Sequence, residues 1–266
     1  MPILGAVLCV INLELDGNSA VLGDGPPLRG VIVGLARHAQ VVDPVVDALV
    51  ATLARLFASD QGELRRQHLA AAPAELAVDL ERLAVTLGWA QPGAKVVWRP
   101  EHLPALVGYL PAATPMAVYG RGTNWVYAAL ARLAYPAAYF SFDVRLGWVP
   151  AQALPVGAPP QAAPLRFRIE GDDGWLHVEG LLPHSYMDFG ELETVVVPAI
   201  PPATGVILSG KLPHWLYTSL AVTYAAAPWL AVYQPQLSGA VVIHSTQSQP
   251  AVGAVVSTEV ARQNDG

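Results

Sequence analysis

The sequence predicts an α/β protein built from two tandem strand-helix-strand units. A similar turn occurs twice at an offset of 90 residues: residues 119–131 read YGRGTNWVYAALA and residues 209–221 read SGKLPHWLYTSLA. An apolar strand pattern precedes each turn and another follows each helix pattern, which indicates parallel strands joined by a crossover helix. The proline-rich stretch GWVPAQALPVGAPPQAAP at residues 147–164 separates the two instances. We therefore expect a linker at residues 148–164, between a first unit at 1–147 and a second at 165–257.

The second instance has the clearer set of elements. LRFRIEG and WLHVEGLL alternate apolar and polar residues on either side of DDG at 172–174, which is typical of a hairpin. A helical or irregular stretch, SYMDFGELETVV, comes next. GVILSG then predicts a buried strand, LPHWLYTSLAVTY a helix with Pro213 in its first turn, and WLAVYQ and GAVVIHS two further strands. The tail at 258–266 is polar and expected to fray.

The first instance is surrounded by more material. Residues 3–15 and 29–37 read as strands, and residues 43–59 as a helix with Asp43 as its N-cap. Leucines at helical spacing predict a second helix over residues 73–88. MAVYG, TNWVYAALARLA and AAYFSFD then give the strand, helix and strand of the core unit. The two helices before residue 90 are expected to be an insertion relative to the second unit.

Composition sets limits on partners and location. Of the 266 residues, 53% are hydrophobic and 14% charged, which indicates a folded chain with a sizeable core. The single cysteine, Cys9, excludes an internal disulfide and a thiolate metal cluster, and it fits a reducing cytoplasm. The apolar N-terminus meets Glu14 and Asp16 too soon for a membrane span. A net charge of −6 argues against double-stranded DNA as a partner.

The repeated turn suits a phosphate group. In each copy a strand ends in glycine, a basic residue follows and a helix begins within about three residues, so helix N–H groups and a cation face one ligand. The candidate ligand-binding residues are Gly120, Arg121, Gly122, Asn124, Gly210, Lys211 and His214. Neither copy has the G-x-x-x-x-G-K-[ST] or G-x-G-x-x-G pattern, so an ATPase is not expected. Glycine at such a turn also serves packing alone, and that alternative stays open.

Aromatic residues follow each turn. Trp125 and Trp215 are expected in the core, whereas Tyr127 and Tyr217, two positions further on, point elsewhere and are freer to stack on a base or to line an interface.

A charged pair ends the strand after the first helix. Asp143 and Arg145 lie on the same side of an extended chain, at the carboxyl end of a strand where open α/β sheets bind ligands. Asp143 could act as a base or metal ligand, and Arg145 could neutralise a phosphate. A salt bridge, or an aspartate that only stabilises a turn, is the alternative.

The stretch GVILSGKLPHWLYTSLAVTYAAAPWLAVYQPQLSGAVVIHS resembles the CRISPR-associated Csx-three family of type III systems, a small member of the CRISPR-associated Rossmann-fold (CARF) group. The resemblance covers residues 165–255 well and residues 116–149 more weakly. It implies two tandem Rossmann-like units forming an intramolecular pseudo-dimer, the first with extra helices. It also implies an antiviral-defence protein that binds cyclic tetra-adenylate or short RNA and cleaves the ring as a ring nuclease.

The departures from the family pattern limit what carries over. The family's D-P-R motif is Asp143-Val144-Arg145 in the first copy but Gln234-Pro235-Gln236 in the second, and the family's preceding histidine is alanine near Ala134 and Ala225. The resemblance suggests a composite catalytic site of Asp143, Arg145 and His244. The only cofactor it brings into consideration is Mn²⁺. A ring-binding sponge or sensor without cleavage, a short-RNA binder and a subunit that binds another Cas protein are the alternatives, and further self-association stays open.

Overall fold

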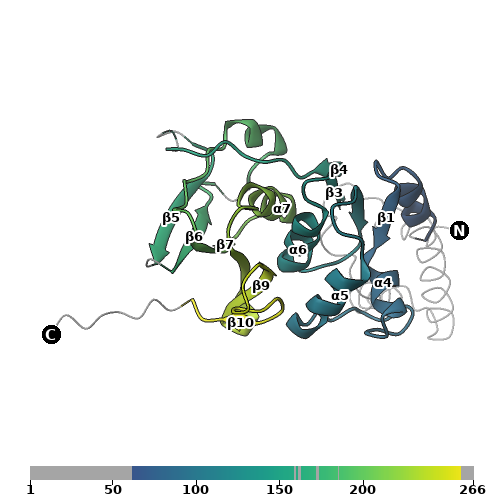
Figure 1. Cartoon of the computed structure of the whole chain (residues 1–266). Coiled ribbons are helices and arrows are strands. Elements are labelled where there is room, and N and C mark those ends of the chain that lie inside the picture. The colour runs from purple at the N-terminus through teal and green to yellow at the C-terminus, as the bar shows by residue number, and fades with distance from the viewer. Residues whose placement is uncertain (1–61, 159, 161–162, 172–173, 185, 259–266) are drawn as a thin grey trace, which may run out of the picture. The chain divides into compact units, whose positions relative to one another are not determined.

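The computed structural model describes residues 62–158, 160, 163–171, 174–184 and 186–258 (Figure 1). The strands expected at 3–15 and 29–37, the helix expected at 43–59 and the tail after residue 258 lie outside the described residues. The chain divides into two compact units, residues 1–71 and residues 72–266. In the first unit, residues 62–70 are helical. Both sheets described below, and the segment predicted to link them, fall in the second unit.

The first half of this second unit is a four-stranded sheet with the strand order β1-β2-β3-β4. Its strands are β1 (Leu76–Asp79), β2 (Met116–Tyr119), β3 (Tyr139–Asp143) and β4 (Gly147–Pro150). β1, β2 and β3 are parallel, and β4 is antiparallel to β3. The helices α4 (Leu80–Thr86), η1 (Pro100–His102) and α5 (Leu103–Tyr109) come between β1 and β2. Helix α6 (Asn124–Ala134) connects β2 to β3, as expected for a parallel crossover.

The helix predicted over residues 73–88 is wrong in its first part, because residues 76–79 form β1 and pair with β2. Asp79 ends the strand, and its side chain accepts the N–H groups of Glu81 and Arg82, both at 3.1 Å, to start α4. Pairing with a neighbouring strand has overridden a helical leucine spacing. A second difference is β4: Trp148 to Pro150 form a strand where the linker was expected, because an edge position tolerates proline.

The second half is a six-stranded sheet in the order β10-β9-β8-β7-β6-β5. Its strands are β5 (Arg166–Gly171), β6 (Trp175–Leu181), β7 (Gly205–Gly210), β8 (Trp229–Gln234), β9 (Gly239–Ser245) and β10 (Val255–Val256). The predicted hairpin of β5 and β6 and the parallel pairing of β7 with β8 are confirmed. Helix α7 (His214–Thr223) connects β7 to β8, and the 3-10 helices η2 (Phe189–Thr194) and η3 (Pro235–Leu237) complete the half.

The two halves share one order of strands. In each, two consecutive parallel pairs are followed by an antiparallel one: β1, β2, β3 and β4 in the first half, and β6, β7, β8 and β9 in the second. The connecting helix follows the second of these strands in both. The pairing registers also correspond. Val118 of β2 pairs with Ser141 of β3, and Leu208 of β7, which lies 90 residues after Val118, pairs with Val232 of β8.

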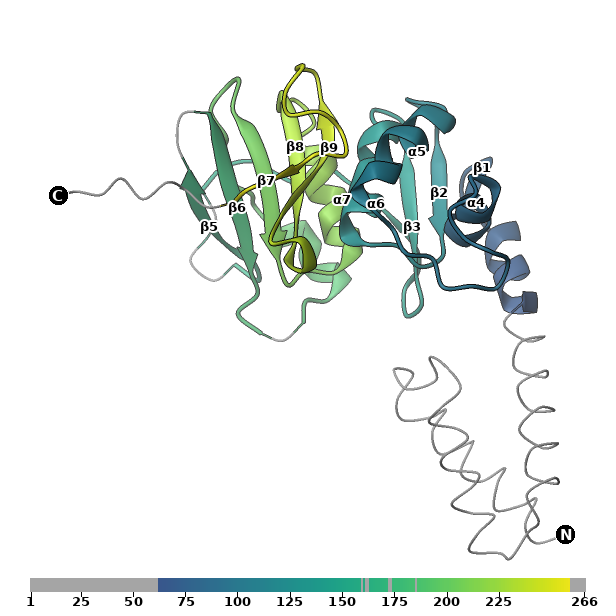
Figure 2. The same cartoon turned by 90° about the horizontal axis from the view of Figure 1, so that it is seen from below.

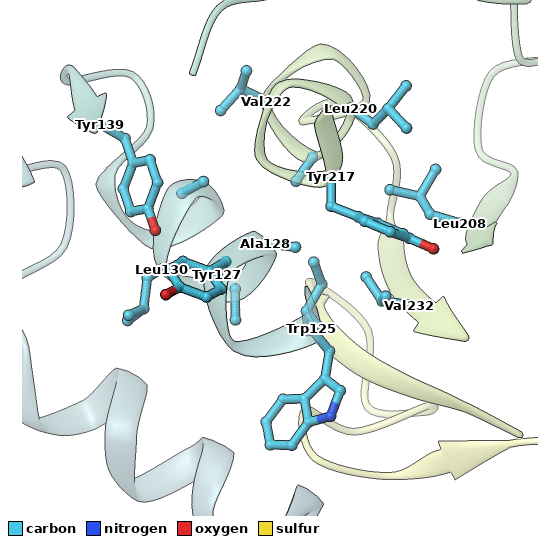
Figure 3. Packing of buried hydrophobic residues seen from close by; sticks show 14 of the residues in the cluster. Trp125, Tyr127, Ala128, Leu130, Tyr139, Leu208, Tyr217, Leu220, Val222 and Val232 are labelled. Carbon is cyan, nitrogen blue, oxygen red and sulfur yellow. The ribbon is translucent and has the colours of Figure 1, made fainter. Parts of the chain in front are cut away.

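Helices α6 and α7 pack against each other between the two sheets (Figures 1 and 2). One cluster of buried residues runs through both halves, and Figure 3 shows part of it around these helices. Trp125 and Trp215 are each 1% exposed, which confirms their expected place in the core. The expectation that Tyr127 and Tyr217 are freer is wrong, because both rings are buried and each hydroxyl donates to the carbonyl of the glycine seven residues earlier.

The segment after β4 is fastened to α7. The Leu154 N–H donates to Thr223 Oγ1 at 2.9 Å, and the Gln152 N–H donates to Ser219 Oγ at 3.4 Å. This part of the proline-rich segment therefore lies along the second half's helix, in addition to joining the halves.

Candidate functional site

The turn at residues 120–124 is held rigidly by its backbone. Gly120 has a φ of +106°, a conformation that favours glycine, and its carbonyl accepts the Tyr127 hydroxyl hydrogen bond. The Arg121 carbonyl accepts the Trp98 indole N–H at 3.0 Å. The Arg121 side chain is exposed. The turn thus presents a guanidinium to solvent from a fixed backbone, as a ligand-binding arginine requires.

The turn at residues 210–214 has the same construction. Gly210 has a φ of +124°, and the Tyr217 hydroxyl donates to its carbonyl at 2.7 Å. Lys211, at the position of Arg121, is exposed. The two turns therefore each carry one exposed cation beside the start of a helix.

Neither helix start has a side-chain cap. Thr123 is the N-cap of α6, yet its side chain makes no capping bond, and its Oγ1 is buried without a partner among the described residues. Pro213, the N-cap of α7, has no side-chain acceptor to offer. Uncapped N–H groups at a helix start favour an anion, so both starts suit a phosphate oxygen.

Packing also requires glycine at these turns. A Cβ on Gly210 would lie 2.2 Å from the Gly180 carbonyl oxygen, and one on Gly122 would lie 2.9 Å from Leu80 Cδ1. A Cβ on Gly120 would only touch Leu80, at 3.5 Å. The packing alternative therefore explains Gly210, where the clash is with a backbone oxygen, and a positive φ favours glycine at both Gly120 and Gly210.

Asp143 sits at the carboxyl end of β3, on the same sheet edge as the 120–124 turn. It is 8% exposed, and its Oδ1 accepts the N–H groups of Arg145 at 2.8 Å and Leu146 at 3.3 Å. The exposed Arg145 places its Nε 3.9 Å from the same oxygen. These contacts match the turn-stabilising alternative, but they all use Oδ1. Oδ2 makes no such contact with the described residues, and it is the oxygen left for chemistry.

His214 brings the two halves together at this point. Its ring stacks on that of Tyr127, with ring centroids 4.6 Å apart and planes 27° apart. Its Nε2 is buried and has no hydrogen-bond partner in the described part of the chain. Burial lowers the pKa of His214, and the negative charge of Asp143 opposes this shift. An imidazole from the second half thus lies within electrostatic reach of the carboxylate of the first.

His244 is not part of this cluster. It faces Leu230 across the sheet, at the amino end of β8, and its Nε2 lies 3.0 Å from Arg132 Nη2 in the last turn of α6. Arg132 lies eight residues from the start of α6, roughly 12 Å along the helix axis. The structure therefore does not bring His244 together with Asp143 and Arg145 in the suggested composite site. Burial, together with the Arg132 charge, lowers the pKa of His244 to about 4.

From the sequence, His214 was predicted to bind a ligand, but its contact with Tyr127 was not predicted. The signal was available in the doubled turn: if two equivalent helices pack together, the first turn of one can face the first turn of the other. The reasoning also missed His177, whose Nε2 lies 2.7 Å from Ser209 Oγ.

The side chains that the structure describes do not form a protein metal centre for Mn²⁺. Among the described residues, no three histidine, cysteine, aspartate or glutamate side chains gather where they could hold a metal ion. One Asp143 oxygen is already engaged by two backbone N–H groups. We therefore derive no chemical step through a metal held by these side chains.

Comparison with known proteins supports the family resemblance for the second half. The family model of the CRISPR-associated protein Cas_csx3 matches residues 181–257, so this segment is confirmed to resemble a CRISPR-associated family. The matched range includes the 210–214 turn, α7, β8 and β9, and it does not extend to residues 116–149.

A relative of unknown activity gives a second, shorter match. An uncharacterized protein of Aquifex aeolicus (strain VF5) is 39% identical over 56 residues, which is 21% of this chain and 50% of that protein. The chain therefore spans about half the length of this curated relative. In the part of the chain that the structure describes, no helix has the length and apolar character needed to cross a membrane.

Proposed function

We propose that the two halves form an intramolecular pseudo-dimer of Rossmann-like units that binds cyclic tetra-adenylate in type III CRISPR defence and opens it as a ring nuclease. The contact that carries this proposal is the stack of His214 on Tyr127, because it joins the two halves at a tyrosine that bonds to the 120–124 turn, where the charge of Asp143 also acts on the His214 pKa. The match of residues 181–257 to a CRISPR-associated family supports the biological setting.

Binding follows from the paired turns. A cyclic tetranucleotide with two-fold symmetry presents equivalent phosphates on opposite sides. Two turns that share backbone geometry, each with an exposed cation and an uncapped helix start, suit two such phosphates. The net charge of −6 fits a small ligand better than long nucleic acid, because only a local basic site is needed.

Cleavage needs no external nucleophile. The 2′-hydroxyl of one adenosine attacks the adjacent phosphorus, and the bond from phosphorus to the 5′-oxygen breaks, which leaves a 2′,3′-cyclic phosphate and a 5′-hydroxyl. Asp143 serves the proton transfer, and Arg145, which is exposed beside it, stabilises the negative charge on the phosphorane.

The alternative is a protein that binds the ring without cutting it. The observation that favours it is the second half's Gln234 and Gln236, whose side chains hydrogen-bond each other where the first half has Asp143 and Arg145. In this reading the protein is a sponge or sensor for the messenger.

Radiolabelled cyclic tetra-adenylate separates these functions. We expect a shifted ligand in a native gel and a linear product on a denaturing gel, with the product absent in Asp143→Ala. A shifted but intact ring would support the sponge, and no shift would refute both functions. If cleavage uses no metal ion, neither added manganese nor an added chelator should change its rate.

The pseudo-dimer has its own test. Arg121→Ala and Lys211→Ala should each weaken ring binding about tenfold, because each removes one charge-assisted phosphate contact. Lys95→Ala, which changes the chain's only other lysine, is the matched control and should bind normally. Equal affinity in the wild type and the three variants would refute the proposal that both turns bind one ligand.

A further inference from the structure

The strand registers show which residues of the two halves occupy equivalent positions. Val118 faces Ser141 and Leu208 faces Val232, so residues 141 and 232 are equivalent, and Asp143 corresponds to Gln234. By the same count Arg145 corresponds to Gln236. His214 is the first residue of α7, and its equivalent is Asn124, the first residue of α6.

At the three paired positions, only one of the two possible centres has ionisable side chains. It combines Asp143 and Arg145 of the first half with His214 of the second, which stacks on Tyr127. Gly120 accepts the Tyr127 hydroxyl and Asp143 is tied to its own loop by two N–H bonds, so the partners of the imidazole are fixed in place.

The reciprocal centre holds only amides at the equivalent positions. These positions are Asn124, Gln234 and Gln236, and the two glutamine side chains hydrogen-bond each other. An amide can hold a phosphate oxygen or a ribose hydroxyl, but it cannot take up or release a proton near pH 7. The reciprocal centre can therefore still form hydrogen bonds to a ligand, but its amide side chains cannot transfer protons.

Resting on the proposed function, we propose that His214 is a catalytic residue supplied by the second half to the Asp143 centre, and that the chain opens cyclic tetra-adenylate at one phosphodiester only. The product is then a linear tetranucleotide with one 2′,3′-cyclic phosphate, where a site with two equal centres would release two dinucleotides.

His214 has an atom available for this role. The buried Nε2 makes no hydrogen bond with the residues that the structure describes. The residue as a whole is only half-buried, which leaves Nδ1 as the ring nitrogen that a ligand can reach. The imidazole accepts the proton of the 2′-hydroxyl and returns it to the departing 5′-oxygen, and Asp143 serves this transfer because its negative charge stabilises the protonated ring in between. Because burial lowers its pKa below 6.5, the ring is neutral at pH 7, as a proton acceptor must be.

Mass spectrometry distinguishes the two products. Ring opening by the internal 2′-hydroxyl consumes no water, so a singly opened product has the mass of the ring but a different chromatographic retention, whereas two cuts give fragments of half that mass. We expect only the unchanged mass under full conversion. Half-mass fragments would overturn the single-cut inference while leaving the ring nuclease intact. An intact ring would refute cleavage altogether.

Substitution of His214 tests its role. His214→Asn, the residue of the reciprocal centre, should lower the rate of ring opening about 100-fold or more, with little change in the dissociation constant of the intact ring. The acidic limb of the pH–rate profile should disappear with it. His184→Asn, at an exposed histidine in the same half, is the matched control. Unchanged cleavage by a folded His214→Asn protein would overturn the assignment.

Rebuilding the second centre gives the opposite test. The triple variant Asn124→His, Gln234→Asp and Gln236→Arg should convert the product to half-mass dinucleotides. If this variant folds, binds the ring and still releases only the full-mass linear product, these three positions do not account for the single cut and the inference fails.

Discussion

The two halves of the molecule share one backbone arrangement but differ in the side chains at one strand end. In both, a glycine with positive φ lies at the end of a strand or directly after it, a tyrosine hydroxyl bonds back to that glycine, and a tryptophan of the following helix is buried. They differ at the next strand end, where the first half has Asp143 and Arg145 and the second has Gln234 and Gln236. Groups that maintain the backbone are thus present in both halves, and the charged pair at the strand end in only one.

The largest expected effect tests whether the halves share one core. Trp125→Ala and Trp215→Ala should each cost about 3–5 kcal/mol of unfolding free energy, because each empties a fully buried site in the same hydrophobic cluster. Urea denaturation followed by circular dichroism should show a single transition in both variants. Two separate transitions would mean that the halves unfold independently. Val144→Ala, 85% exposed in wild type, is the control and should change little.

Alanine substitution of the glycines should destabilise the protein by different amounts at the two turns. Gly210→Ala should cost about 3 kcal/mol or more, because it adds a clash with the Gly180 carbonyl oxygen to the strain of positive φ. Gly120→Ala adds only the strain of positive φ and should cost about 1–2 kcal/mol of unfolding free energy. Thermal melts of the two variants measure the difference, and equal losses would contradict it.

The tyrosine hydroxyls should behave alike. Tyr127→Phe and Tyr217→Phe each remove one hydrogen bond to a glycine carbonyl, which should cost about 1 kcal/mol in either half. Tyr127→Phe keeps the ring on which His214 stacks, so cleavage should survive. Denaturation of the two proteins side by side checks the equality, and a large excess loss in one half would show that its turn depends more on that bond.

A further expected effect is the pH response of stability at the contact of Arg132 with His244. Above pH 6.5 His244 is neutral in both the folded and the unfolded chain. Between pH 6.5 and about 4 the unfolded chain takes up a proton that the folded chain refuses, so stability falls as the pH is lowered through this range.

His244→Gln keeps an acceptor for Arg132 but cannot be protonated, so this slope should be shallower in the variant. It should not vanish, because burial also lowers the pKa of His102, His177 and His214. Denaturation midpoints measured from pH 4 to pH 7 give the comparison, and identical slopes would contradict it.

Much of the second half was predictable because its signals are local. Alternating residues around 172–174 gave the β5 and β6 hairpin, and the apolar run at 205–210 followed by Pro213 gave β7 and α7. Residues 76–79 were read as helix because a four-residue strand carries too few positions to show its own period. Its pairing with β2 is a contact made 40 residues away in sequence.

The candidate site divides in the same way. The places of Arg121 and Lys211 before a helix and of Asp143 at a strand end were predicted from sequence, because they depend only on the local order of strand, turn and helix. The proposed partnership of Asp143 with His214 was not, and the suggested partner His244 lies at the other end of α6. Residues on different elements meet only after the helices have packed.

By itself, the sequence determined the doubled turn, the order of strands and helices around it and the loss of the charged pair in the second copy, since these depend on residue type and short spacing. The tertiary structure decided which side chains of the two halves meet. The physical reason is the packing of α6 on α7, which stacks His214 on Tyr127 and leaves His244 to bond Arg132 at the far end.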